Sequence, residues 1–371
     1  MTPAEQAQRI GAWLATCPGL GPDCRLESLV PMAGGQSSEL LLAKVERPGK
    51  GREGVVIRLE QRGRQLFLTP DIAREFRTID GVFRAGTVAV PQPLGLEATG
   101  DVIGTPFLAM RQVMGEPLLG RPSMHLAGPL PGMAPDQRRA AACNGLDAMA
   151  AIHAIDWRST HPFLAEEGAA ELSLDRHLQR VAEWYSWATQ GRPFPVTDRA
   201  MEYLLENRPP LRDHDPVLLW GDARPGNILF DPDQKVAAVL DWEGAYLGPR
   251  ALDVGYWLMS DLFHAESIGV ARLAGWPTEA ETIARYEAAS GVKAEDLDYF
   301  IVLGCLFMAT TLIRAADLGM AAGRLQPGST MGAGNSLTQI IAQRLGLPIP
   351  ALSPDFIAHR SLPPGTRGLA G

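Results

Sequence analysis

The chain has 371 residues, of which 46% are hydrophobic, so a sizeable core can form and a wholly disordered protein is excluded. It carries 34 Lys and Arg against 42 Asp and Glu, a net charge of −8. This balance disfavours a dedicated nucleic-acid-binding protein, which normally presents a basic surface. The charge is also uneven: residues 1–115 hold 13 basic and 12 acidic residues, and residues 116–371 hold 21 and 30. Two parts with different roles are therefore expected.

Four scattered cysteines without a CxxC pair are typical of a reduced, cytoplasmic protein. The residues after Met1 lack the apolar stretch of a secretory signal. No uninterrupted apolar run reaches the roughly 18 residues of a membrane span. The apolar segment 299–313 is shorter and flanked by charged residues, so a buried core helix is expected there and no membrane span.

The first 115 residues predict a small β-rich part with one inserted helix. Hydrophobic patterning predicts five strands, at 25–32, 39–46, 54–60, 91–98 and 105–113. Helices are expected over 3–15 and near 70–84. A Gly-rich turn, AGGQSS, separates the first two strands.

Residues 114–135 are rich in Pro, Gly and Met, which predicts a linker. Beyond them the pattern becomes helical, with a strand–loop–strand–turn–strand insert at 217–241. Helices are expected over 136–156, 172–190, 199–206, 251–263, 277–289 and 295–319. The Pro- and Gly-containing residues 348–371 are expected to form a loosely packed tail.

The insert at 217–241 carries the strongest chemical signal. An apolar strand leads to Asp222 in a loop containing Gly and Pro, Asn227 follows five residues later, and Asp241 lies fourteen residues further on. Phosphoryl transfer depends on positioning and charge neutralisation. A loop carboxylate can accept the proton of an acceptor hydroxyl, and an Asn and a second carboxylate offer the hard oxygen ligands that magnesium prefers. Each residue alone is compatible with an ordinary turn, but the spaced set favours this chemistry.

The pattern D-x-R-P-x-N followed by D-W-E resembles the catalytic and metal-binding loops of the protein-kinase-like fold. More closely, it resembles the aminoglycoside phosphotransferase (APH) and choline kinase-like family. The stretches AVLDWEGAYLGPRALDVGYW, GGQSSELLL and VIGTPFLAMRQVMGEPL are similar to the branch associated with acyl-CoA dehydrogenases. The resemblance implies an α+β, protein-kinase-like two-lobed fold. It implies an N-terminal nucleotide-binding lobe at 1–115, a mainly helical C-terminal catalytic and substrate-binding lobe at 116–347, and a tail at 348–371.

The resemblance also implies roles for individual residues. Asp222 matches the catalytic base, and Arg224 is placed to neutralise the transferred phosphate. Asn227 and Asp241 match the magnesium ligands, and Asp253 matches a helix Asp that braces the catalytic loop. The implied ATP-binding residues are the nucleotide-covering turn, the strand cation with its partner Glu, and the adenine-binding hinge: Gly34, Gly35, Gln36, Ser37, Arg58, Glu75, Gln112 and Val113.

One position departs from the family pattern, since Trp220 replaces the usual His before Gly-Asp. Arg58 stands where kinases normally have a Lys, and the resemblance implies that Arg is also common there in the branch associated with acyl-CoA dehydrogenases. Two further positions are open to more than one interpretation. His153, on an apolar helix, is interpreted as structural. Glu243 either approaches the metal or the acceptor, or hydrogen-bonds the loop.

The function expected is an ATP- and magnesium-dependent phosphotransferase acting on a hydroxyl of a small molecule, with a metabolic hydroxy compound or a hydroxyacyl thioester favoured. Apolar and aromatic residues of the C-terminal lobe support this acceptor class: Trp184, Tyr185, Trp187, Tyr256, Trp257 and Met259. The alternatives are an aminoglycoside-type antibiotic phosphotransferase and a catalytically silent nucleotide-binding scaffold. The oligomeric state is left open.

Overall fold

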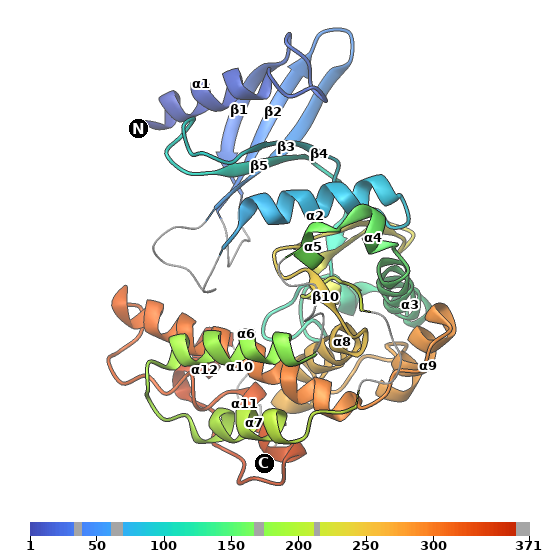
Figure 1. Cartoon of the computed structure of the whole chain (residues 1–371), viewed down its shortest axis with the longest axis vertical. Helices are drawn as coiled ribbons and strands as arrows, with labels where there is room; N and C mark the ends of the chain where they lie inside the picture. Colours follow the sequence, from blue (N-terminus) through green and yellow to red (C-terminus); the bar gives the residue numbers. More distant parts are fainter. Residues whose placement is uncertain (33–38, 61–69, 167–173, 211–215, 361–371) are drawn as a thin grey trace. The chain divides into compact units, whose positions relative to one another are not determined.

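The computed structural model describes residues 1–32, 39–60, 70–166, 174–210 and 216–360 (Figure 1). The chain divides into two compact units. Unit 1 contains Met1–Met114 together with Ala238–Glu243, and unit 2 contains Gly115–Ala237 together with Gly244–Gly371. Unit 1 is built around a β-sheet and unit 2 is mainly helical, so the predicted α+β, two-lobed fold is confirmed.

Unit 1 contains a five-stranded antiparallel sheet with the strand order β1-β2-β3-β5-β4. The third strand is central, and its Ile57 pairs with Leu41 on β2 and with Ala109 on β5. The strand bounds are β1 Arg25–Pro31, β2 Leu40–Arg47, β3 Gly51–Leu59, β4 Pro93–Glu97 and β5 Phe107–Arg111.

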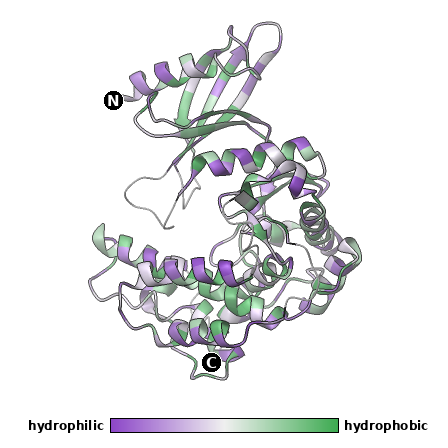
Figure 2. Ribbon diagram, in the orientation of Figure 1, coloured by the Kyte–Doolittle hydropathy of each residue, from purple (hydrophilic) through white to green (hydrophobic). Residues whose placement is uncertain are grey.

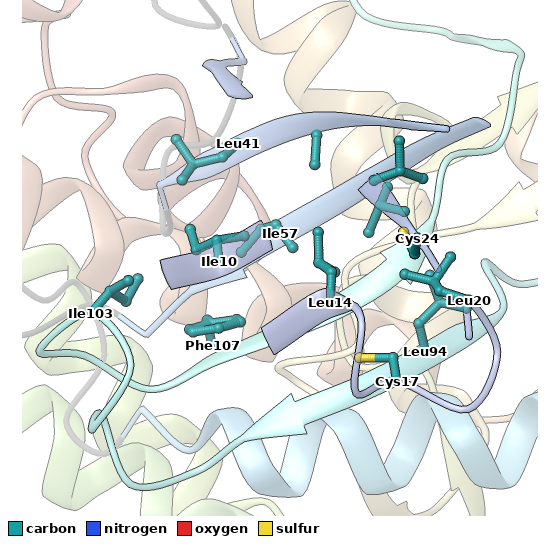
Figure 3. Packing of buried hydrophobic residues seen from close by; sticks show 14 of the residues in the cluster. Ile10, Leu14, Cys17, Leu20, Cys24, Leu41, Ile57, Leu94, Ile103 and Phe107 are labelled. Atoms are coloured by element: carbon teal, nitrogen blue, oxygen red, sulfur yellow. The ribbon is translucent and has the colours of Figure 1, made fainter. Parts of the chain in front are cut away.

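Two helices belong to unit 1. Because side chains alternate between the faces of a strand, the two helices contact different side chains of the sheet. Helix α1 (Pro3–Leu14) begins with a capping box at Thr2, and its buried Ile10 and Leu14 share one core cluster with Ile57 and Phe107 (Figure 3). Successive side chains of a strand point to opposite faces. The neighbour of Ile57, Arg58, therefore points to the other face of the sheet.

Helix α2 (Ile72–Ala85) contacts β4 and β5 and supplies Glu75 to Arg58. The helix is amphipathic, with hydrophobic and hydrophilic residues on different faces in Figure 2. It begins at the N-cap Asp71, whose side chain accepts the N–H of Arg74, and ends at Gly86 in the left-handed conformation.

A short segment from much later in the chain completes unit 1. Residues Ala238–Glu243 belong to it although both flanking segments belong to unit 2. The N–H of Val239 donates a 2.8 Å hydrogen bond to the carbonyl of Ala89, and Trp242 is 1% exposed. The segment therefore carries Asp241 and Glu243 into the unit that holds Arg58.

Unit 2 is mainly helical and also contains two small sheets, of which only part of β9 belongs to unit 1. The β7 strand pairs with β10, and β6, β8 and β9 form the other sheet. The strands are β6 Glu116–Pro117, β7 Val217–Leu219, β8 Ile228–Phe230, β9 Val236–Val239 and β10 Tyr246–Gly248. The helices are α3 Pro135–His153, α4 Trp157–Thr160, α5 Phe163–Glu166, α6 Leu174–Thr189, α7 Pro195–Glu206, α8 Ala251–His264, α9 Glu279–Ser290, α10 Leu297–Ala321, α11 Ser336–Arg344 and α12 Pro354–Arg360.

The core of unit 2 is built on α8 and α10, which make extensive contacts with each other. A Cβ on Gly255 of α8 would lie 2.6 Å from the Cβ of Phe300 on α10, so only glycine allows this close approach. Helix α10 is long and apolar enough to cross a membrane by length and composition, but 67% of its most apolar window is buried inside the protein. The helix is therefore part of the core, as predicted for residues 299–313.

Two segments differ from the sequence prediction. The Pro- and Gly-rich residues 114–135, expected to be a linker, contain β6 and bury Leu118, Met124 and Leu130. Near the end of the chain, α12 forms where loose packing was expected, and its Phe356 is completely buried. Apolar side chains between the prolines explain both differences, because their burial stabilises segments with weak intrinsic structure.

Candidate active site

A tight backbone contact fixes the loop that follows β7. Gly221 has φ +87°, and a Cβ at this position would lie 2.0 Å from the carbonyl oxygen of Gly244. Only glycine adopts this conformation easily and leaves room for the second backbone. The next residue is Asp222, so the contact determines where its side chain starts.

Asp222, Arg224 and Asn227 form one hydrogen-bonded group in this loop. The Nε of Arg224 lies 3.0 and 3.1 Å from the two carboxylate oxygens of Asp222. The side-chain amide of Asn227 donates to the carbonyl oxygen of Asp222 at 3.0 Å and to its carboxylate at 2.5 Å. The Asp222 side chain remains 20% exposed. The loop thus holds a carboxylate in one orientation and leaves part of it accessible.

A buried carboxylate holds the backbone just before Asp222. Asp253, in the first turn of α8, accepts hydrogen bonds from the N–H groups of Trp220 at 2.7 Å and Gly221 at 2.9 Å. His153 of α3 contacts the same carboxylate through Nε2 at 3.0 Å, and its Nδ1 lies 2.7 Å from the hydroxyl of Tyr286 on α9. These contacts agree with the predicted bracing role of Asp253 and with the structural interpretation of His153.

In unit 1, three carboxylates surround the guanidinium of Arg58. Its Nε lies 3.1 Å from Glu75, and its Nη2 lies 3.3 Å from Asp241 and 2.5 Å from Glu243. Arg58 is 7% exposed and Glu75 is 5% exposed. The sequence motif D-W-E thus places two acids on one side of the cation, and α2 places the third.

The burial of Glu75 has an electrostatic consequence. Desolvation raises its pKa to about 8, opposed by the charge of Arg58 and reinforced by those of Glu243 and Asp241. Three carboxylates around one guanidinium leave an excess of negative charge when all are ionised. Asp241 also has φ +63°, a left-handed conformation that is uncommon for a non-glycine residue and is found at functional sites.

The structure thus groups six of the predicted site residues within the two units. Asp222, Arg224 and Asn227 come together in unit 2, and Arg58, Glu75 and Asp241 come together in unit 1. Gln112 and Val113 follow β5, and the N–H of Gln112 donates to the carbonyl of Gly54 at 2.8 Å. The turn residues Gly34, Gly35, Gln36 and Ser37 lie outside the described residues.

The structure removes most of the support that aromatic residues gave to an apolar acceptor. Five of the six residues named for it are core residues, at most 7% exposed: Trp184, Tyr185, Tyr256, Trp257 and Met259. Helical periodicity cannot distinguish these two environments, because a stripe of aromatic residues has the same sequence pattern in a core and in a pocket. Sequence reasoning also missed Tyr286, whose contact with His153 depends on the packing of α9 against α3.

Comparisons with known proteins agree with this geometry. Part of the chain is 28% identical over 250 residues to acyl-CoA dehydrogenase family member 11 of Rattus norvegicus. The match covers 64% of this chain and 29% of the relative, so the chain spans less than a third of that protein.

Two solved structures show the same fold. A protein described as an aminoglycoside phosphotransferase of Ralstonia eutropha has a TM-score of 0.69 and 25% identity, with 91% of this chain and 98% of that chain covered. A thermostable mutant of aminoglycoside phosphotransferase APH(4)-Ia, in a ternary complex with AMP-PNP and hygromycin B, has a TM-score of 0.56 and 14% identity, with 90% and 98% covered.

The model of the phosphotransferase enzyme family matches residues 31–294, which is more than half of the chain and includes both groups of site residues. The Asp222 loop, its Asp253 brace and the Arg58–Glu75 pair all lie within this match. The chain belongs to the phosphotransferase enzyme family.

Proposed function

We propose that this protein transfers the γ-phosphate of ATP to a hydroxyl group of a small molecule in a magnesium-dependent reaction. The observation that carries the proposal is the Asp222 carboxylate, oriented by Arg224 and Asn227 on a loop that Asp253 fixes. A partly exposed carboxylate held in this way can accept the proton of an attacking hydroxyl. The AMP-PNP complex of the APH(4)-Ia neighbour supports a nucleotide as the phosphate donor.

The chemistry of the donor set fits a divalent cation. The acids around Arg58 outnumber its single charge, and Asp241 and Glu243 offer hard oxygen ligands. Within the described residues, no group of three or more His, Cys, Asp or Glu side chains is placed to hold a metal, so other oxygens such as phosphate would complete its ligands. Asp241 and Asn227 are the proposed magnesium ligands. The bound ion would neutralise charge on the transferred phosphate.

The other residues have proposed roles in binding and orientation. Arg58 would bind ATP phosphate oxygens through its guanidinium fork, and Glu75 would hold it in place. Asp222 would take the proton of the acceptor hydroxyl as the phosphate transfers in line. Arg224 lies beside Asp222 and would neutralise charge on the transferred group. Gln112 and Val113 would bind the adenine through their backbone. We also propose that the protein is cytoplasmic.

The proposed acceptor is a metabolic hydroxy compound, with a hydroxyacyl thioester favoured by the similarity to acyl-CoA dehydrogenase family member 11. The APH(4)-Ia neighbour binds hygromycin B, so an antibiotic acceptor is the second candidate.

The first test measures the melting temperature with ATP, with and without magnesium, and the second measures ADP release across hydroxy compounds and aminoglycosides. Stabilisation by Mg-ATP and acceptor-dependent ADP release are expected. Stabilisation with no ADP release from any acceptor would instead support a silent nucleotide-binding scaffold.

A further inference from the structure

Three arginines from distant parts of the sequence, Arg121, Arg224 and Arg360, lie close enough together in unit 2 for the charges of the first two to act on the third. Arg224 belongs to the catalytic loop and pairs with Asp222. Arg121 lies in the Pro- and Gly-rich segment after β6, and Arg360 is the last residue of α12. The catalytic motif accounts for Arg224 only. The other two arginines have no role in the proposed transfer of phosphate.

Contacts fix the position of Arg360 next to Arg121. The guanidinium of Arg360 donates to the carbonyl oxygen of Pro122, the residue that follows Arg121. Its other face lies over the ring of Phe263, with 4.1 Å between Cζ and the ring centroid. The Nε of Arg360 is buried and has no hydrogen-bond partner in the part of the chain that the structure describes. A buried donor without a partner is costly, so the described contacts leave part of the hydrogen-bonding capacity of Arg360 unused.

The charges around Arg360 are positive. Burial, and then the charges of Arg121 and Arg224, lower its pKa from the ordinary value of arginine. Among the described residues, neither Arg121 nor Arg360 makes an ion pair with a carboxylate. Burial and the charges of Arg360 and Arg224 also lower the pKa of His264 well below its usual value, so this ring is neutral. Asp222 compensates one of the three guanidiniums, and two positive charges remain.

We call this group the Arg121–Arg360 cluster, after the two arginines whose charges no carboxylate compensates among the described residues. The residues beside the cluster include exposed apolar side chains. Leu119 and Leu126 are 48% and 46% exposed on the segment that carries Arg121, and Ile357 is 37% exposed one helical turn before Arg360. A surface that combines uncompensated cations with apolar side chains suits a ligand with an anionic end and an apolar part.

We propose that the Arg121–Arg360 cluster binds a phosphate group of the acceptor, remote from the hydroxyl that Asp222 deprotonates. The inference rests on the proposed function and names its acceptor class: a hydroxy compound that already carries a phosphate or pyrophosphate. The two uncompensated charges match the charge of a phosphate monoester, about −1.5 to −2 at neutral pH. Guanidinium forks bind phosphate oxygens with good geometry. A polycationic aminoglycoside is disfavoured, because it would meet the positive charge of this cluster.

Direct binding tests the cluster without turnover. Isothermal titration calorimetry of the full chain with pyrophosphate, and with 4′-phosphopantetheine against pantetheine, compares ligands with and without phosphate. Arg121→Gln removes an exposed guanidinium and Arg360→Gln a partly buried one. Arg324→Gln is the matched control, since Arg324 is an exposed arginine of the same unit and belongs to neither site. We expect Arg121→Gln and Arg360→Gln to weaken phosphate binding by about tenfold or more, as loss of a charge-assisted hydrogen bond does, and Arg324→Gln to leave it unchanged.

The outcomes separate this inference from the proposed function. Equal phosphate affinity in wild type, Arg121→Gln and Arg324→Gln overturns the cluster as an anion site. Arg121→Gln carries the test alone if Arg360→Gln does not fold. ADP-release assays compare each acceptor with and without its phosphate group. Arg121→Gln should raise KM for the phosphorylated acceptor and leave KM for ATP unchanged. A rise in KM for ATP instead overturns the assignment of the cluster to the acceptor. If no acceptor releases ADP but phosphate binding still depends on Arg121, the proposed function fails and the anion site stands.

Discussion

The guanidinium of Arg58 lies 2.5 Å from the carboxylate of Glu243, two residues beyond the proposed magnesium ligand Asp241. The same nitrogen lies 3.3 Å from Asp241, so the segment after β9 supplies two acids to one cation. Glu243 therefore occupies the guanidinium that is proposed to bind ATP phosphate. This contact gives the first prediction.

Replacing Glu243 by Gln should strengthen ATP binding in the absence of magnesium, because a negative charge that competes for Arg58 is removed. The expected gain in ATP affinity is about threefold to tenfold, which corresponds to the free energy of one ion pair that is partly exposed to solvent. Titration calorimetry with ATP in chelator measures it. Weaker binding, seen only when magnesium is present, would instead show that Glu243 contributes to the metal site.

Asp222→Asn should nearly abolish turnover and leave ATP affinity within about threefold. The substitution keeps the shape of the side chain and an oxygen for Arg224, but removes the proton acceptor. ADP release and ATP titration on the same preparation measure both quantities. Turnover at the wild-type rate would contradict the assignment of Asp222 as the base.

Asp241→Asn should remove most of the magnesium-dependent stabilisation by ATP. Asparagine tolerates the left-handed φ of +63° at this position, so the backbone is preserved while the charged ligand is lost. The melting temperature with ATP, compared with and without magnesium, reports the effect. A wild-type magnesium response would exclude Asp241 as a ligand.

Asp253→Ala should lower the free energy of unfolding by about 3 kcal/mol, because two N–H groups and His153 lose their buried acceptor. Denaturant unfolding measures this loss. Asp101→Ala serves as the control, because Asp101 is exposed and should change stability little. A change equal to that of the control would show that the brace contributes no stability.

The pH dependence of stability should reveal Glu75. Its pKa is raised by burial from 4.5 to about 8 in the folded state, so the folded protein keeps a proton that the unfolded chain releases. Stability is therefore lost as the pH rises from about 4.5 to about 8. Glu75→Gln should flatten this part of the profile, measured as the urea midpoint at several pH values in metal-free buffer. An unchanged slope would show that Glu75 does not titrate in this range.

Sequence reasoning predicted elements whose signal is local. The bounds of α1 and α2 and the five strands of unit 1 follow from hydrophobic periodicity, and the structure has them within a few residues. The spacing of Asp222, Asn227 and Asp241 identified the candidate site because these three residues lie close together in the sequence and form a motif that can be recognised there.

Contacts between distant segments could not be predicted in this way. Arg360 donates a hydrogen bond to Pro122, 238 residues away in the sequence, and no local sequence pattern predicts this contact. The buried Phe356 likewise depends on a partner ring, Phe263, on α8. Hydropathy alone also cannot separate a core tryptophan such as Trp257 from one that lines a pocket.

The inclusion of Ala238–Glu243 in unit 1 matters for anyone who dissects the protein into fragments. A fragment ending at Met114 would contain buried Arg58 and Glu75 but neither Asp241 nor Glu243. It would also lack the Val239 N–H that satisfies Ala89. The N-terminal lobe is thus not encoded by one continuous stretch of gene, and a truncation that looks natural in the sequence would divide a charge cluster that the fold assembles.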